Sequence, residues 1–196
     1  MKFQTLAISA ALATPVVAVA GLKLTRSGYE SPNYSVVQEI EGAEIRRYPT
    51  MAVVSTKRAN GAGNRERDSR FMRLFGYIDK GNDADQKIAM TTPVLMGAND
   101  SMSFVIPTEV AEKGSPSPKS KDVFLDKFKG GTFAAMRFKG GRGEAVEEEA
   151  VARLRKLLAT EELKPATKAE PIFAYYDPPW TPKFLRRNEV LLRLKP

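Results

Sequence analysis

Residues 132–160, TFAAMRFKGGRGEAVEEEAVARLRKLLAT, combine the local patterns that decide the fold. Residues 132–138 predict a strand, and the glycines of 140–143 predict a turn. Residues 144–160 predict a helix, because the apolar residues recur at helical spacing. These residues form one broad stripe: Val146, Ala150, Val151, Leu154, Leu157 and Leu158. A strand that leads through a tight turn into an amphipathic helix indicates an α+β domain.

The preceding part of the chain repeats this order. A helix is predicted over 65–79, because Phe71, Leu74, Phe75 and Ile78 fall at i, i+3, i+4 and i+7. The sequence also predicts a hairpin turn at Glu41-Gly42 and a solvated loop at 113–120. The other predicted strands are 35–40, 43–48, 51–57, 88–95, 101–106, 172–176 and 190–194. Two halves with one helix each suggest a mixed sheet or barrel flanked by two helices.

The bulk composition limits the domain count and the partners. A chain of 196 residues, less about twenty at the front, has room for one core of ordinary size. Hydrophobic content of 42% with 28% charged residues is typical of a globular domain. A net charge of +8 favours anionic partners such as carboxylates, phosphates or an acidic membrane surface.

The chain contains no His and no Cys. Nucleophilic triads that use these residues are therefore excluded, as are zinc sites built on imidazole or thiolate. No acidic pair has a spacing that nominates it for acid–base work. We therefore expect a binding protein rather than an enzyme.

The first 26 residues look like a targeting segment. Lys2 precedes a nearly uninterrupted apolar run from Leu6 to Leu24, and Ala18 and Ala20 precede Gly21 in an A-x-A-like arrangement. Residues 5–24 are also long enough to be an uncleaved membrane anchor. Either interpretation predicts an exported (periplasmic or extracellular) domain, or one anchored at the membrane outside the cytoplasm.

The remaining motifs have structural interpretations. The glycines at 61–63 and 140–143 do not complete a nucleotide-binding fingerprint, so they predict turns before helices. The cations Lys183, Arg186 and Arg187 lie near Trp180 and Phe184, which is only a weak nucleic-acid pattern. We therefore expect no nucleic-acid partner. The oligomeric state is not indicated by the sequence.

Two strings carry a family resemblance: KIAMTTPV at 87–94 and YDPPWTPKFLRRNEV at 176–190. They resemble the two signature segments of the SOUL haem-binding protein family. Supporting matches are IRRY at 45–48, Tyr77-Ile78 with Gly81-Asn82, and MSFVIP at 102–107. The resemblance covers residues 34–196.

The resemblance implies a fold and a function. The implied fold is a distorted β-barrel of two pseudo-symmetric halves, each with one flanking helix, similar to the effector-binding domains of bacterial drug-responsive regulators. The implied function is non-catalytic, reversible binding of haem or a related tetrapyrrole, for buffering, carriage or sensing.

The resemblance also implies a site. The first helix would contact the ring through one face, and basic residues near the last signature would bind the propionates. Arg suits carboxylates because its fork can bind both oxygens. The implied haem-binding residues are Arg67 (or Arg70), Phe71, Met72, Leu74, Phe75, Ile78, Lys183 and Arg187.

The resemblance leaves the iron ligand open. Members of the family that ligate iron do so with a His, which this chain lacks. A Met thioether or a Tyr phenolate can also ligate haem iron, so Met90 and Met72 are candidates. Met more often fills gaps in a core. A hydrophobic clamp without a protein ligand is the other interpretation.

Two rival functions follow from the same sequence. A binder of a cationic or amphipathic small molecule would need a buried carboxylate, for which Glu170 and Glu189 are the candidates. An enzyme acting on a tetrapyrrole or lipid would use Asp, Glu, Tyr or Lys as acid or base.

Overall fold

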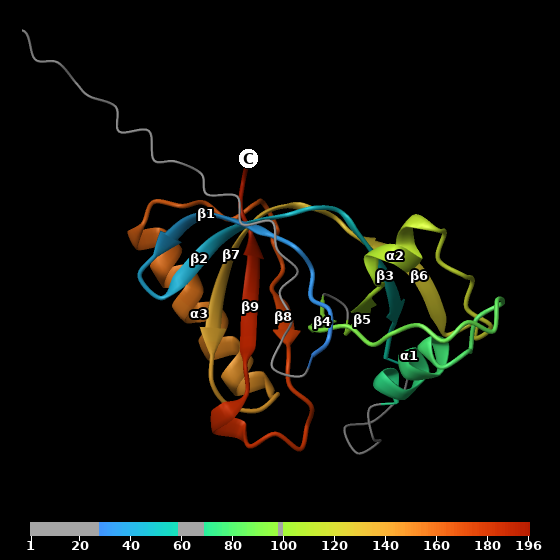
Figure 1. Cartoon of the computed structure of the whole chain (residues 1–196). Coiled ribbons are helices and arrows are strands. Elements are labelled where there is room, and N and C mark those ends of the chain that lie inside the picture. The colour runs from blue at the N-terminus through green and yellow to red at the C-terminus, as the bar shows by residue number, and fades with distance from the viewer. Residues whose placement is uncertain (1–27, 59–68, 98–99) are drawn as a thin grey trace, which may run out of the picture.

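The computed structural model describes residues 28–58, 69–97 and 100–196 (Figure 1). The described chain forms one antiparallel sheet of nine strands, with helices packed against it. The strands are β1 Ser35–Ile40, β2 Ala43–Tyr48, β3 Met51–Thr56, β4 Val94–Met96, β5 Met102–Val105, β6 Val123–Phe128, β7 Gly131–Phe138, β8 Ile172–Tyr175 and β9 Asn188–Arg193. The helices are α1 Arg70–Ile78, α2 Thr108–Glu112, α3 Glu144–Thr160 and the short 3₁₀ turn η1 Lys183–Leu185.

Apart from the edge strand β1, the strand order is symmetric. The order is β1-β2-β7-β9-β8-β4-β5-β3-β6, so without β1 the central pair is β8 and β4. One half contains β7, α3, β8 and β9, and the other contains β3, α1, β4 and β5 in the same strand–helix–strand–strand sequence. Each half also receives its outer strand across the molecule, because β2 pairs with β7 and β6 pairs with β3. Figure 1 shows α3 and α1 in different halves of the molecule.

The expected α+β class is confirmed, but the expected barrel is not. The sheet ends in β1 on one side and β6 on the other, and these two strands do not pair with each other. The sheet is therefore open. The half with α3 is completed by β2 from earlier in the chain, and the half with α1 is completed by β6 from later in the chain. The two halves are therefore joined by exchanged strands and not by closure.

Strand alternation places the core on both faces of the sheet. Val190 and Leu192 of β9 pack under α3, and Val54 of β3 packs under α1 with Leu74. The intervening side chains point to the opposite face, where residues from both halves form a third cluster that includes Val53 and Leu191. This arrangement follows from the two-residue period of a strand.

Most predicted elements are confirmed, with shifted ends. The strands predicted at 35–40 and 43–48 and the helix predicted at 144–160 have the bounds observed for β1, β2 and α3. The helix predicted at 65–79 is confirmed over Arg70–Ile78, and part of the prediction lies outside the described residues. The targeting segment (1–26), including the proposed membrane anchor at 5–24, also lies outside them.

In the half with α1, one predicted strand is shorter than expected and two elements were not predicted. The strand predicted at 88–95 is reduced to Val94–Met96, because the backbone amides of Ile88 and Thr92 bond to Ile78 and Glu30 instead of to a neighbouring strand. β6 was missed because it is an edge strand with mostly exposed side chains, which hides the alternation. The short helix α2 was also missed.

A turn after α1 is held by one buried side chain. Asn82 has no exposed surface, and its amide nitrogen donates to the carbonyl oxygens of Tyr77 at 3.0 Å and Gln86 at 2.7 Å. Its Oδ1 accepts a hydrogen bond from the backbone N–H of Gln86 at 3.0 Å. The side chain therefore provides hydrogen-bond partners for one backbone group of Tyr77 and two of Gln86.

We expect Asn82→Ala to lower the free energy of unfolding by about 2 kcal/mol, because these backbone groups lose their partners. Urea denaturation measures the loss. Asn33→Ala is the matched control, since Asn33 is exposed and should change stability little. Equal losses in both variants would contradict the assigned role of Asn82.

Candidate functional site

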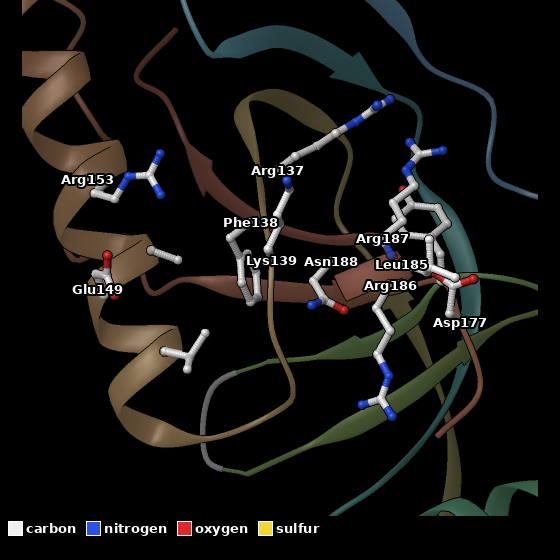
Figure 2. Close-up of a pocket in the computed structure, with 13 residues that line it drawn as sticks. Arg137, Phe138, Lys139, Glu149, Arg153, Asp177, Leu185, Arg186, Arg187 and Asn188 are labelled. Carbon is white, nitrogen blue, oxygen red and sulfur yellow. Dashed lines mark hydrogen bonds between the residues drawn. The ribbon is translucent and has the colours of Figure 1, made fainter. Parts of the chain in front are cut away.

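A cavity of about 770 Å³ lies between α3 and the connection from β8 to β9. Figure 2 shows Glu149 and Arg153 of α3 on one side, Asp177 and Arg186 on the other, and Phe138 of β7 between them. The lining residues are Arg137, Phe138, Lys139, Val146, Glu149, Ala150, Arg153, Tyr176, Asp177, Leu185, Arg186, Arg187 and Asn188. We call this cavity the α3 pocket.

The α3 pocket combines an apolar wall with a cationic rim. Phe138, Val146 and Leu185 contribute apolar surface. Five cationic side chains against two carboxylates leave an excess of three positive charges around it. Lys139 and Arg153 have no ion pair or side-chain hydrogen bond within the described chain, so both are available to an anionic ligand.

A buried charge network lies behind the pocket. The carboxylate of Glu189 is fully buried and accepts hydrogen bonds from Arg46 at 2.7 and 3.2 Å. Arg187 donates to the same carboxylate at 2.8 and 3.1 Å, and the Tyr176 hydroxyl donates to it at 3.0 Å. The Arg187 guanidinium also lies 4.0 Å from the centre of the Tyr176 ring. The network thus fixes two side chains that line the pocket.

The network shifts the pKa values of its members. Burial alone would raise the pKa of Glu189, but Arg46 and Arg187 outweigh it and lower the pKa to about 2. Burial is the main cause that raises the pKa of Tyr176 well above its ordinary value, and the charge of Glu189 adds to it. Tyr176 therefore stays a protonated donor to Glu189 at neutral pH.

A second cavity, of about 1000 Å³, lies over the central pair of strands. Met96 of β4 and Phe173 of β8, which pair in register, form part of its floor. Its charges are mixed, because four cationic and four acidic side chains line it. The acidic residues are Asp100, Glu144, Glu147 and Glu148. We call it the central cleft.

The structure divides the predicted ring-contacting face of α1. Leu74 and Ile78 are buried core residues, so neither presents a surface to a ligand. Phe71, Met72 and Phe75 are exposed by 38%, 62% and 40%, and the two Phe rings stack with centroids 6.3 Å apart. None of the five lines the α3 pocket or the central cleft. A role for this face in binding stays a prediction.

The cations predicted to bind the propionates do not lie together in the structure. Arg187 lines the α3 pocket, whereas Lys183 is exposed on η1 and does not line it. Arg70 is buried and donates to the backbone oxygen of Asp100, and it borders the central cleft. Arg67 lies outside the described residues.

Neither candidate iron ligand lies at the α3 pocket. Met72 is exposed on α1, and Met90 is half-buried against the core cluster under α1. The described residues contain no group of three or more acidic side chains that could hold a metal ion. No Met lines the α3 pocket, and the hydroxyl of Tyr176, the Tyr that lines it, is hydrogen-bonded to Glu189.

Three cations of the α3 pocket were not predicted from the sequence as site residues: Arg137, Lys139 and Arg153. They come from β7, the turn after it and α3, and they meet only in the folded chain. A weak signal existed, because Arg137 and Lys139 flank Phe138 just before the glycine-rich turn.

The fold and the α3 pocket define a small α+β domain with a cavity beside its longest helix. The chain belongs to the SOUL family, since the family described as SOUL heme-binding protein matches residues 29–193. No curated protein shows significant sequence similarity to the chain. In the described residues, no helix has the length and apolar character needed to span a membrane.

Several solved structures share the fold. A hydrolase from Listeria innocua has 20% identity and a TM-score of 0.54, with 81% of this chain and 94% of that chain covered. An uncharacterized conserved protein from Listeria innocua has 18% identity and a TM-score of 0.56, with 78% and 92% covered. The C-terminal domain of EcmrR has 11% identity and a TM-score of 0.53, with 78% and 96% covered. Identities this low establish the fold and not the activity.

Proposed function

We propose that this chain binds haem or a related tetrapyrrole without chemical turnover, and that the ligand occupies the α3 pocket. The observation that carries the proposal is the pairing of an apolar wall with two unpaired cations, Lys139 and Arg153. A tetrapyrrole offers a flat apolar ring and two carboxylates, so both features have a counterpart. Membership of the SOUL family supports the same ligand class.

The buried carboxylate supports this ligand over a cationic one. Glu170 is exposed, and Glu189 is buried but already neutralised by Arg46 and Arg187. Neither therefore offers the buried, unpaired carboxylate that a cationic ligand would require. Expected export, or anchoring outside the cytoplasm, would place the pocket where it could carry or buffer an external tetrapyrrole.

The central cleft supports the alternative function, binding of a cationic or amphipathic small molecule. Glu144 and Glu148 line this cleft and have no ion pair or side-chain hydrogen bond within the described chain. Both are exposed, so they would pair with a cation at a solvated surface and not in a buried site. Saturable binding of the fluorescent lipophilic cation rhodamine 6G, lost in Glu148→Lys, would favour this function over the first.

We expect ferric haem and metal-free protoporphyrin to bind with affinities within about tenfold of each other, because the α3 pocket contains no Met and its Tyr176 stays protonated in a hydrogen bond to Glu189. Visible-absorption titration of the purified protein measures both. Binding of haem at least a hundredfold tighter would show that a protein group ligates the iron. Binding of neither compound would refute the proposal.

A further inference from the structure

The connection between β8 and β9 exposes large apolar side chains. Trp180 is 83% exposed, Phe184 is 74% exposed and Leu185 is 50% exposed. Trp180 and Phe184 are the most exposed large apolar side chains in the described chain. Figure 1 shows this connection at the end of the sheet opposite the C-terminus. Such side chains mark an interaction surface when they gather in one segment.

The segment is ordered by its own hydrogen bonds. The Arg186 guanidinium donates to the carbonyl oxygen of Thr181 at 2.7 Å and to that of Pro179. The amide of Thr181 donates to Pro178 at 3.0 Å, and the amide of Leu185 donates to the carbonyl of the proline at 182 at 2.9 Å. The backbone is thus fixed while the aromatic side chains remain exposed. Binding through them costs little ordering of the chain.

The positive charge of the segment favours an anionic partner. Residues 178–188 contain three cations, Lys183, Arg186 and Arg187, and no carboxylate. Lys183 has no ion pair or side-chain hydrogen bond within the described chain. Trp beside Lys and Arg is the composition that favours the interface of a membrane with anionic lipids. A second copy would present the same positive charges and be repelled.

We propose that residues 178–186 form a membrane-contact loop that inserts Trp180 and Phe184 into the headgroup region of an anionic bilayer. Leu185 and Arg186 of this loop also line the α3 pocket, so the pocket would open beside the membrane surface. The contact itself requires no tetrapyrrole, and its test is made without one.

Trp180 is the only Trp of the chain, so its fluorescence reports on the loop alone. The full chain is mixed with vesicles of phosphatidylglycerol and phosphatidylcholine, and with vesicles of phosphatidylcholine alone. We expect the Trp180 emission to shift to shorter wavelength, and to be quenched by brominated lipids, only with the anionic vesicles. This readout distinguishes loop insertion from tethering by any other part of the chain.

Two variants and one control complete the test. Phe184→Ser and Lys183→Glu should each lower the vesicle partition constant, measured from the Trp180 shift, by roughly tenfold. Phe124→Ser, which removes an exposed Phe from β6, should leave it unchanged. An unshifted emission from the natively folded protein overturns the proposal. So does an equal shift with both vesicles, or a shift that follows protein concentration without vesicles, which would indicate self-association.

Discussion

Replacing Glu189 with Gln is expected to lower the free energy of unfolding by about 3 kcal/mol, because it leaves buried arginines without their counter-charge. Arg46 is 1% exposed and pairs with Glu189 at 2.7 Å. Arg187 loses the same partner, although it is 34% exposed and water compensates part of its loss. Urea denaturation at pH 7 measures the change.

Glu170→Gln is the matched control, since Glu170 is exposed and the same substitution there should change stability by less than about 0.5 kcal/mol. A loss below about 1 kcal/mol in Glu189→Gln would show that the network contributes little to stability. It would also remove the argument that Glu189 fixes Arg187 and Tyr176 at the wall of the α3 pocket.

The stability difference between the two proteins should depend on pH. The ordinary pKa of a glutamate is 4.5, and that of Glu189 in the folded chain is about 2. A carboxyl whose pKa is lowered by folding stabilises the fold above its unfolded pKa, and loses that contribution as the pH falls toward the folded pKa. The advantage of the wild type over Glu189→Gln should therefore be complete at pH 6 and shrink between pH 4.5 and 2. A pH-independent advantage would contradict the pairing of an ionised Glu189.

Local patterns predicted the two longer helices, α1 and α3, and the first strands, because those elements are decided by nearby residues. The apolar stripe from Val146 to Leu158 predicts a helix whatever surface it packs against, and α3 has the predicted bounds. The strand order could not be predicted, because β2 pairs with β7 and β6 pairs with β3 across long stretches of chain. For the same reason the barrel was expected, whereas the structure has an open sheet that ends in β1 and β6.

The site was predicted only in part, for a related reason. An apolar helix face predicts burial, and it does not say whether core or ligand covers it. Leu74 and Ile78 are covered by core. Of the two candidates for a buried carboxylate, Glu189 is buried and Glu170 is exposed. Glu189 is neutralised by Arg46, which lies 143 residues earlier in the chain and could not be paired with it from local sequence. Of the cations predicted to bind the propionates, only Arg187 lines the α3 pocket. Arg153 of α3 also lines this pocket and was not predicted.

The double variant Lys139→Glu/Arg153→Glu is expected to weaken binding of protoporphyrin about a hundredfold. It removes the two unpaired cations of the α3 pocket and places two carboxylates opposite the propionates. Visible-absorption titration measures the change, and salt should weaken wild-type binding because the rim charges are partly exposed. Leu185→Asp, at the apolar wall, should also weaken binding, because it puts a charge against the ring.

Arg155→Glu provides the control that decides between the two cavities. Arg155 lies on α3 two residues after Arg153 and is also exposed, but it lines the central cleft. If the α3 pocket holds the ring, Arg153→Glu weakens binding and Arg155→Glu does not. The reverse result would move the tetrapyrrole to the central cleft, and equal losses would show that net charge, not a built site, attracts the ligand.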